Sequence, residues 1–108
     1  MKQFVWVLLS AASLISAGTA HAADAKTGDA LLKKNACIAC HSIDKKMVGP
    51  AYKDVAAKYR GQKDIAPKLV EKVKKGGVGV WGQVPMPPNP NVPDADAKAL
   101  VDWILSLK

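Results

Sequence analysis

The sequence predicts a small all-α domain, and three observations favour this class. Near the end of the chain, apolar residues recur at helical spacing, as at Leu100, Val101 and Ile104. No stretch alternates apolar and polar residues for long enough to form a sheet. Glycines at 61 and 76 stand where helical stretches would end. We therefore expect one domain of about four helices, without internal repeats or a linker.

The first 22 residues have the features of a cleaved secretory signal peptide. Lys2 precedes an apolar run from Phe4 to about Ile15, and small residues lead to Ala22. The run is short and interrupted by serines, so it is a poor membrane span, although an uncleaved anchor is the alternative. We predict cleavage after Ala22 and a periplasmic domain at 23–108 without stable membrane insertion.

Turn and capping residues bound the four helices of this domain. Pro50 suits the first position of a helix, and Gly61 suits the end of the same helix. Asp64 is a candidate N-cap for the next helix, which Gly76 would end. The expected ranges are 24–36, 51–60, 64–75 and 94–107. We expect the last helix to pack on the first.

Cys37 and Cys40 are followed directly by His41, which gives the CxxCH attachment signal of a c-type haem. On one helical turn, residues three and four apart share a face, so all three side chains can face one flat partner. The two thiols suit thioether bonds to haem vinyl groups, and the imidazole suits the proximal iron position. Beyond the leader, the chain has no other cysteine or histidine. We predict one covalently bound haem c.

Other functions of a Cys-x-x-Cys pair are weaker interpretations. The pair alone also serves short disulfides and thioredoxin-like dithiols. A thioredoxin-like site needs strands in a βαβ setting, and none is predicted. Structural zinc needs four Cys or His ligands, whereas residues 23–108 offer three.

Met86 lies in a proline-rich segment, Pro85 to Pro88, and is the candidate sixth iron ligand. Prolines restrict the backbone, so they can hold a thioether in place at low entropic cost. Simple packing is the alternative role for this methionine. Met47, the other thioether of residues 23–108, follows His41 by only six positions. We expect this short tether to keep Met47 at the haem edge.

Two parts of the chain resemble the small bacterial class I cytochromes c of the cytochrome c-551 family. One is MVGPAYKDVAAKY at 47–59, and the other combines GVWG at 79–82 with PMPPN at 85–89. The likeness extends over essentially all of residues 23–108. It implies a cytochrome c fold of about four helices around one haem. It also implies thioether bonds to Cys37 and Cys40, with His41 and Met86 as axial ligands.

The resemblance further implies contacts around these ligands. The carbonyl of Pro50 would accept the outer N–H of His41, which fixes the orientation of a metal-bound imidazole. The indole of Trp81 would donate to a haem propionate, and Asn89 would donate toward the sulfur of Met86. From the residues alone, plain packing of Trp81 and a turn role for Asn89 remain open.

An iron with two axial protein ligands has no open position for oxygen, peroxide or substrate. We therefore predict electron transfer rather than catalysis, with a positive midpoint potential. The resemblance implies respiratory partners in the periplasm. Acceptors would be a nitrite reductase, a terminal oxidase or a peroxidase, and donors a cytochrome complex or a copper protein. A small peroxidase or gas-binding haem protein with an open sixth site is the alternative, and a haem-free thiol oxidoreductase is a further one.

The chain is basic, with 16 Lys and Arg against 9 Asp and Glu and a formal charge of +7, to which the leader contributes Lys2. An apolar docking rim is expected at Met47, Val48, Val84, Pro85, Pro87 and Pro88. Lysines expected around it are Lys33, Lys34, Lys45, Lys46 and Lys53. These charges would steer acidic partners or simply maintain solubility. Nucleic acid is a poor partner for an exported chain with one arginine and no binding motif. We predict a monomer.

Overall fold

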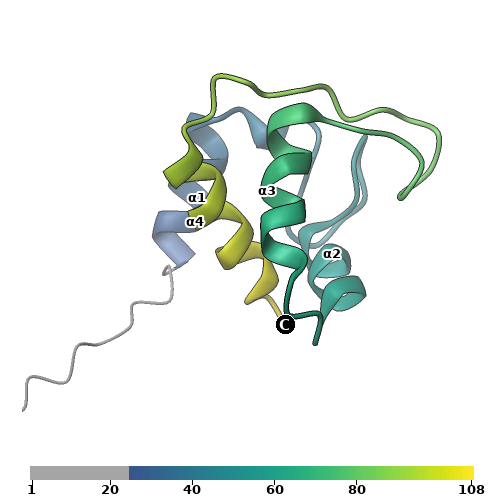
Figure 1. Cartoon of the computed structure of the whole chain (residues 1–108), viewed down its shortest axis with the longest axis horizontal. Coiled ribbons are helices and arrows are strands. Elements are labelled where there is room, and N and C mark those ends of the chain that lie inside the picture. Colours follow the sequence, from purple (N-terminus) through teal and green to yellow (C-terminus); the bar gives the residue numbers. More distant parts are fainter. Residues whose placement is uncertain (1–24) are drawn as a thin grey trace, which may run out of the picture.

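A computed structural model describes residues 25–108 as helices joined by irregular segments (Figure 1). The elements are α1 (Ala25–Lys34), the 3-10 helix η1 (Cys37–Ala39), α2 (Tyr52–Tyr59), α3 (Ile65–Lys75) and α4 (Asp94–Leu105). The described residues contain no strand, only an isolated antiparallel bridge between Gly77 and Met86. The predicted all-α domain is confirmed. The predicted signal peptide lies outside the described residues.

The fourth helix is the centre of the packing, because α4 contacts α1, α2 and α3. The expected contact between the last helix and the first is therefore confirmed. Gly28 of α1 is buried against the indole of Trp103, and a Cβ atom there would overlap the ring. The missing side chain of Gly28 is thus what allows α1 to approach α4 this closely.

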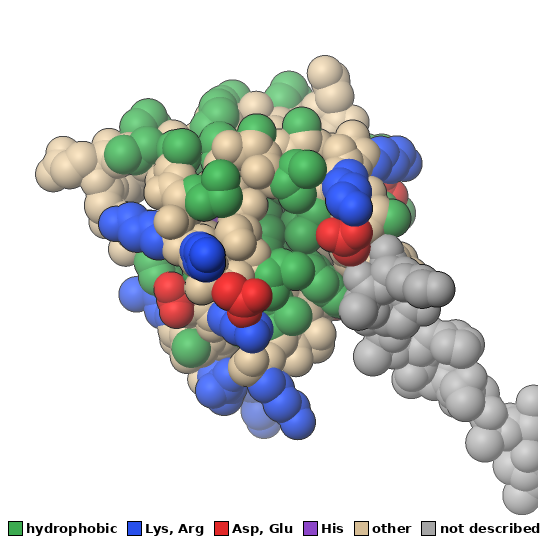
Figure 2. All heavy atoms as spheres, turned by 180° about the vertical axis from the view of Figure 1, so that it is seen from behind, with side chains coloured by type: hydrophobic (Ala, Val, Ile, Leu, Met, Phe, Trp, Pro, Cys, Tyr) green, Lys and Arg blue, Asp and Glu red, His purple; other side chains and the backbone are tan. Residues whose placement is uncertain are grey.

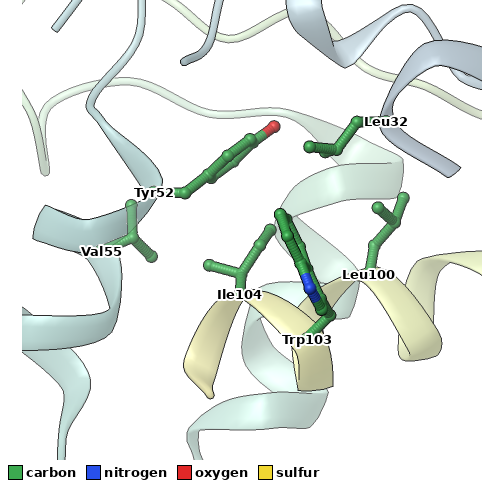
Figure 3. Close-up of a cluster of buried hydrophobic side chains, with 6 residues drawn as sticks. All are labelled: Leu32, Tyr52, Val55, Leu100, Trp103 and Ile104. Atoms are coloured by element: carbon green, nitrogen blue, oxygen red, sulfur yellow. The ribbon is translucent and has the colours of Figure 1, made fainter. Parts of the chain in front are cut away.

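A cluster of buried apolar side chains joins three of the helices (Figure 3). Leu32 comes from α1, Tyr52 and Val55 come from α2, and Leu100, Trp103 and Ile104 come from α4. The Trp103 ring lies among them and is only 4% exposed. Burial of a large apolar side chain stabilises a fold by about 1.5–3 kcal/mol. This cluster therefore holds α1 and α2 against α4.

The first helix was expected to extend to residue 36, directly before the cysteine motif, but it ends earlier. It ends at Lys34, and the side-chain nitrogen of Asn35 donates to the carbonyl of Leu31 at 2.9 Å. Ala36 then adopts a left-handed conformation with φ of 59°. This turn separates α1 from η1, so the two cysteines lie on a short 3-10 turn and the residue after it.

Three helix boundaries also differ in detail from the expected ones. Pro50 lies just outside the N-cap, Ala51, and not at the first helical position of α2. Asp64 occupies the N-cap position of α3 but makes no capping hydrogen bond with its side chain. Helix α4 ends at Leu105, earlier than expected. Gly76 ends α3 as predicted, with a positive φ of 72° that favours glycine.

None of the helices in the described part of the chain combines the length and the apolar character needed to cross a lipid bilayer.

Candidate haem-binding site

A cavity of about 320 Å³ lies between the helices and the segment that follows α3. All four α-helices contribute to its wall, through side chains such as Leu32, Val55, Leu69 and Leu100. The four residues predicted to bind haem or its iron also line it: Cys37, Cys40, His41 and Met86. The structure therefore brings these residues to one largely apolar space.

The backbone around η1 turns the cysteine motif toward this space. The amide nitrogens of Cys40 and His41 both donate to the carbonyl of Cys37, at 3.2 and 3.0 Å. Both cysteines are free and partly buried. Among residues 25–108, no group of three or more His, Cys, Asp or Glu side chains is arranged to hold a metal ion.

The imidazole of His41 is fixed from three directions. Its Nδ1–H donates a hydrogen bond to the carbonyl oxygen of Pro50 at 2.8 Å. The ring stacks on Tyr52, with 4.7 Å between ring centroids and 18° between planes. A Cβ atom on Gly49 would lie only 2.8 Å from Nδ1 and 2.9 Å from Nε2. With the proton on Nδ1 donated in a hydrogen bond to Pro50, the lone pair on Nε2 is available to a metal.

The stacking of Tyr52 on His41 was not anticipated from the sequence. The two residues are eleven positions apart, and no motif spacing connects them. Only the turn at 42–51, pinned by the amide of Tyr52 donating to the carbonyl of Ser42 at 2.9 Å, brings the rings together. Gly49, shortly before α2, was the available signal, because a glycine allows the backbone to pass close to another group.

Two ionisable groups at the cysteine motif, the Cys37 thiol and the Tyr52 hydroxyl, have raised pKa values. Burial is the main cause that raises the pKa of the Cys37 thiol above its ordinary value. Burial also raises the pKa of the Tyr52 hydroxyl, with the nearby Cys37 as the next cause. Reactive dithiol sites instead lower the pKa of the attacking cysteine to expose a thiolate. The environment of Cys37 is therefore unlike that of a thiol oxidoreductase.

Met86 is held by the backbone of the segment that connects α3 to α4. Its amide donates to the carbonyl of Gly77 at 2.8 Å, and the amide of Gly77 donates back at 3.0 Å. A Cβ atom on Gly76 would collide with the backbone of Met86 and Pro87. In contrast, Met47 is 49% exposed and does not line the cavity. The two methionines thus occupy different environments.

Of the two residues expected to contact the haem or its ligand, Trp81 lines the cavity and Asn89 does not. The side-chain nitrogen of Asn89 donates to the carbonyls of Val73 and Pro87, at 3.1 and 3.2 Å. The bond to Val73 ties the connecting segment to α3, and the bond to Pro87 lies within the segment. Neither bond of the Asn89 side chain is the one that was expected, to the sulfur of Met86. Trp81, at the cavity wall, is 40% exposed.

Part of the expected apolar rim lines the cavity. Val48, Val84, Pro85 and Pro87 do, whereas Met47 and Pro88 do not. Figure 2 shows a face with basic side chains at its lower edge and at both sides, and acidic side chains beside some of those nearer its middle. Ion pairs join Lys33 to Asp29, Lys34 to Asp96 and Lys53 to Asp44. Lys45 and Lys46 take part in none of the salt bridges of the described residues, and Lys46 lines the cavity.

The residues present fit a covalently attached haem. Two unpaired thiols, an oriented imidazole and a thioether meet in an apolar cavity, which is the donor set of a c-type haem with His and Met axial ligands. A small all-α domain with this site defines a monohaem protein.

Comparisons with known proteins agree with this class. A family model described as cytochrome c matches residues 25–108. Cytochrome c-552 of Nitrosomonas europaea is 60% identical over 99 residues, which cover 92% of this chain and 91% of the relative. Cytochrome c-551 of Pseudomonas aeruginosa is 51% identical over 98 residues, covering 89% and 93%. The crystal structure of wild-type Nitrosomonas europaea cytochrome c552 matches with a TM-score of 0.72 at 64% identity, covering 74% of this chain and 99% of the other.

The chain belongs to the cytochrome c family, and within it to the small class I proteins of the cytochrome c-551 type. Its cofactor is a single covalently bound haem c with iron. It is a small haem protein that carries electrons.

Proposed function

We propose that the protein is a periplasmic one-electron carrier whose haem iron is held between Nε2 of His41 and the sulfur of Met86. The observation that carries the proposal is that both side chains line the same cavity as Cys37 and Cys40. They reach it from separate segments, one before α2 and one after α3. Two independent approaches are what ligation from opposite faces of a flat group requires.

Each side chain has a separate role in this proposal. Cys37 and Cys40 provide the thioether bonds. Pro50 and Gly49 hold the imidazole of His41, and the bond to Pro50 raises its basicity as a ligand. The bound haem supplies an iron that gains or loses one electron. With ligands fixed in both redox states, the surrounding chain needs little rearrangement for each transfer.

We propose that Trp81, at the cavity wall, donates its indole N–H to a haem propionate.

The function implies partners that give and accept single electrons. Acceptors are respiratory reductases, oxidases or peroxidases, of which a nitrite reductase is one candidate. Donors are a cytochrome complex or a copper protein. A filled sixth position leaves no place for catalysis at the iron.

Visible spectra of the native exported protein test the proposal. We expect the spectrum of a covalent haem that changes reversibly when dithionite is added. Carbon monoxide should leave the reduced spectrum almost unchanged, because Met86 occupies the sixth position. Ready binding of carbon monoxide would show an open site and favour the peroxidase or gas-binding alternative. A colourless protein that reduces disulfides would contradict both.

A further inference from the structure

Lys58, near the end of α2, lies between two aromatic rings. Its ammonium is 5.4 Å from the centroid of the Trp81 ring and 5.9 Å from that of Tyr59. The salt bridges of residues 25–108 join other lysines to carboxylates and leave Lys58 aside. An ammonium within about 6 Å of a ring is attracted by the negative face of its π system. The side chain of Lys58 therefore links α2 to Trp81.

The segment that carries Trp81, residues 78–84, has few other anchors. The bridge between Gly77 and Met86 closes its base. Within the segment, the amide of Gly79 donates to the carbonyl of Gly82 at 3.0 Å. These bonds join the segment to itself and not to the helices, and all three of its valines are more than half exposed. In Figure 1 it extends to a tip beyond α3 before the chain returns to α4. A segment with so few buried contacts opens at low cost. Besides the bond proposed from its indole to a haem propionate, the contact with Lys58 is what ties Trp81 to a helix.

We propose that Lys58 is a positioning residue that clamps Trp81 at the rim of the haem cavity and limits the access of water there. Trp81 and Tyr59 both line the cavity, so movement of Trp81 would widen its opening. Water near the iron favours the cationic oxidised state, and its exclusion raises the midpoint potential. The inference rests on the proposed haem site and adds a residue that acts on that site through Trp81.

Three variants of the holoprotein test the clamp. Lys58→Met keeps the aliphatic stem but removes the ammonium, whereas Lys58→Arg keeps a cation that stacks well on aromatic rings. Lys98→Met, at an exposed position of α4, is the matched control for loss of one charge. The measurement is the solvent exchange rate of the Trp81 indole N–H by NMR, with the buried Trp103 as internal reference.

We expect Lys58→Met to speed exchange at Trp81 by roughly two- to fivefold and to leave Trp103 unchanged. Lys58→Arg and Lys98→Met should behave as the wild type. If Lys58→Met leaves exchange at Trp81 unchanged, or if Lys98→Met speeds it equally, the clamp is refuted. A failure of the haem site would look different, because the wild-type protein would then lack the haem spectrum.

The midpoint potential separates the clamp from the bare charge of Lys58. The change in midpoint potential caused by Lys58→Met is measured twice, once with Trp81 present and once in a Trp81→Leu background. The same charge is lost in both cases, so a difference between the two changes reports coupling between Lys58 and Trp81. We expect the potential to fall further when Trp81 is present. Equal falls in both backgrounds would mean that Lys58 acts by charge alone, and would overturn the proposal.

Discussion

Individual residues around His41 show how the chain prepares a ligand before a metal is bound. The carbonyl of Pro50 accepts a hydrogen bond from Nδ1–H, Tyr52 stacks on the ring, and Gly49 gives the room in which the ring lies. Each contact restricts the imidazole without using Nε2. A side chain that is already oriented loses little freedom when it binds the iron, which favours a stable axial bond.

Residue types and local spacing predicted only some of these contacts. The CxxCH spacing placed Cys37, Cys40 and His41 together because neighbours within one turn must lie close. The stacking of Tyr52 and the bonds of Asn89 depend on how distant segments fold together, and sequence spacing does not reveal this. For Asn89, the turn role left open by the residue type agrees with its bonds to backbone carbonyls.

At the scale of elements, the contact between α1 and α4 depends on Gly28. In an isolated helix Gly→Ala would be stabilising by up to about 1 kcal/mol. Here the new methyl group would overlap the buried ring of Trp103. We expect Gly28→Ala to lower the free energy of unfolding of the holoprotein by about 1–2 kcal/mol, measured by chemical denaturation.

The exposed Ala30, on the same helix, provides the control for this prediction. Ala30→Gly should be destabilising by about 1 kcal/mol through helix propensity alone. If Gly28→Ala proved stabilising by a similar amount, propensity would dominate and the close packing on Trp103 would be wrong.

The helices were predictable from periodicity and from Gly and Pro positions, whereas their exact ends were not. Gly76 ends α3 as expected, because only glycine readily adopts its positive φ. Ala36 adopts a similar φ without being glycine, so nothing in its type indicated the break between α1 and η1. Backbone hydrogen bonds hold Ala36 on both sides, from its amide to the carbonyl of Lys33 at 3.2 Å and from the amide of Ala39 to its carbonyl at 3.3 Å.

Across residues 25–108, the apolar cluster around Trp103 fills one part of the interior, and the cavity takes up another part. All four α-helices line it, so part of each inner face borders this space. A domain of this size has little apolar area to spare and commonly needs a cofactor or disulfide for stability. A haem held in this cavity would therefore form part of the hydrophobic core as well as the redox centre.

The arrangement of charges refines the predicted steering of acidic partners. Lys33 and Lys34 are paired with carboxylates, whereas Lys45 and Lys46 are not, and Lys46 lines the cavity. We expect the double variant Lys45→Gln/Lys46→Gln to slow electron transfer to an acidic partner roughly 3- to 10-fold at low ionic strength. The effect should vanish in high salt. The measurement is the bimolecular rate constant by stopped flow.

The double variant Lys33→Gln/Lys34→Gln is the matched control, because it loses the same net charge away from the cavity. Its rate should change less. Equal losses in both variants would show that only the total charge matters, and a rate independent of ionic strength would exclude steering.

In the proposed haem site, the iron is held from both sides by His41 and Met86. The most direct measurement is the absorption band specific to sulfur ligation of the oxidised haem, compared between Met86→Ala and Met47→Ala. Met86 lines the cavity while Met47 is exposed, so we expect the band to disappear in Met86→Ala and to persist in Met47→Ala. Loss of the band in Met47→Ala, with its retention in Met86→Ala, would contradict this account.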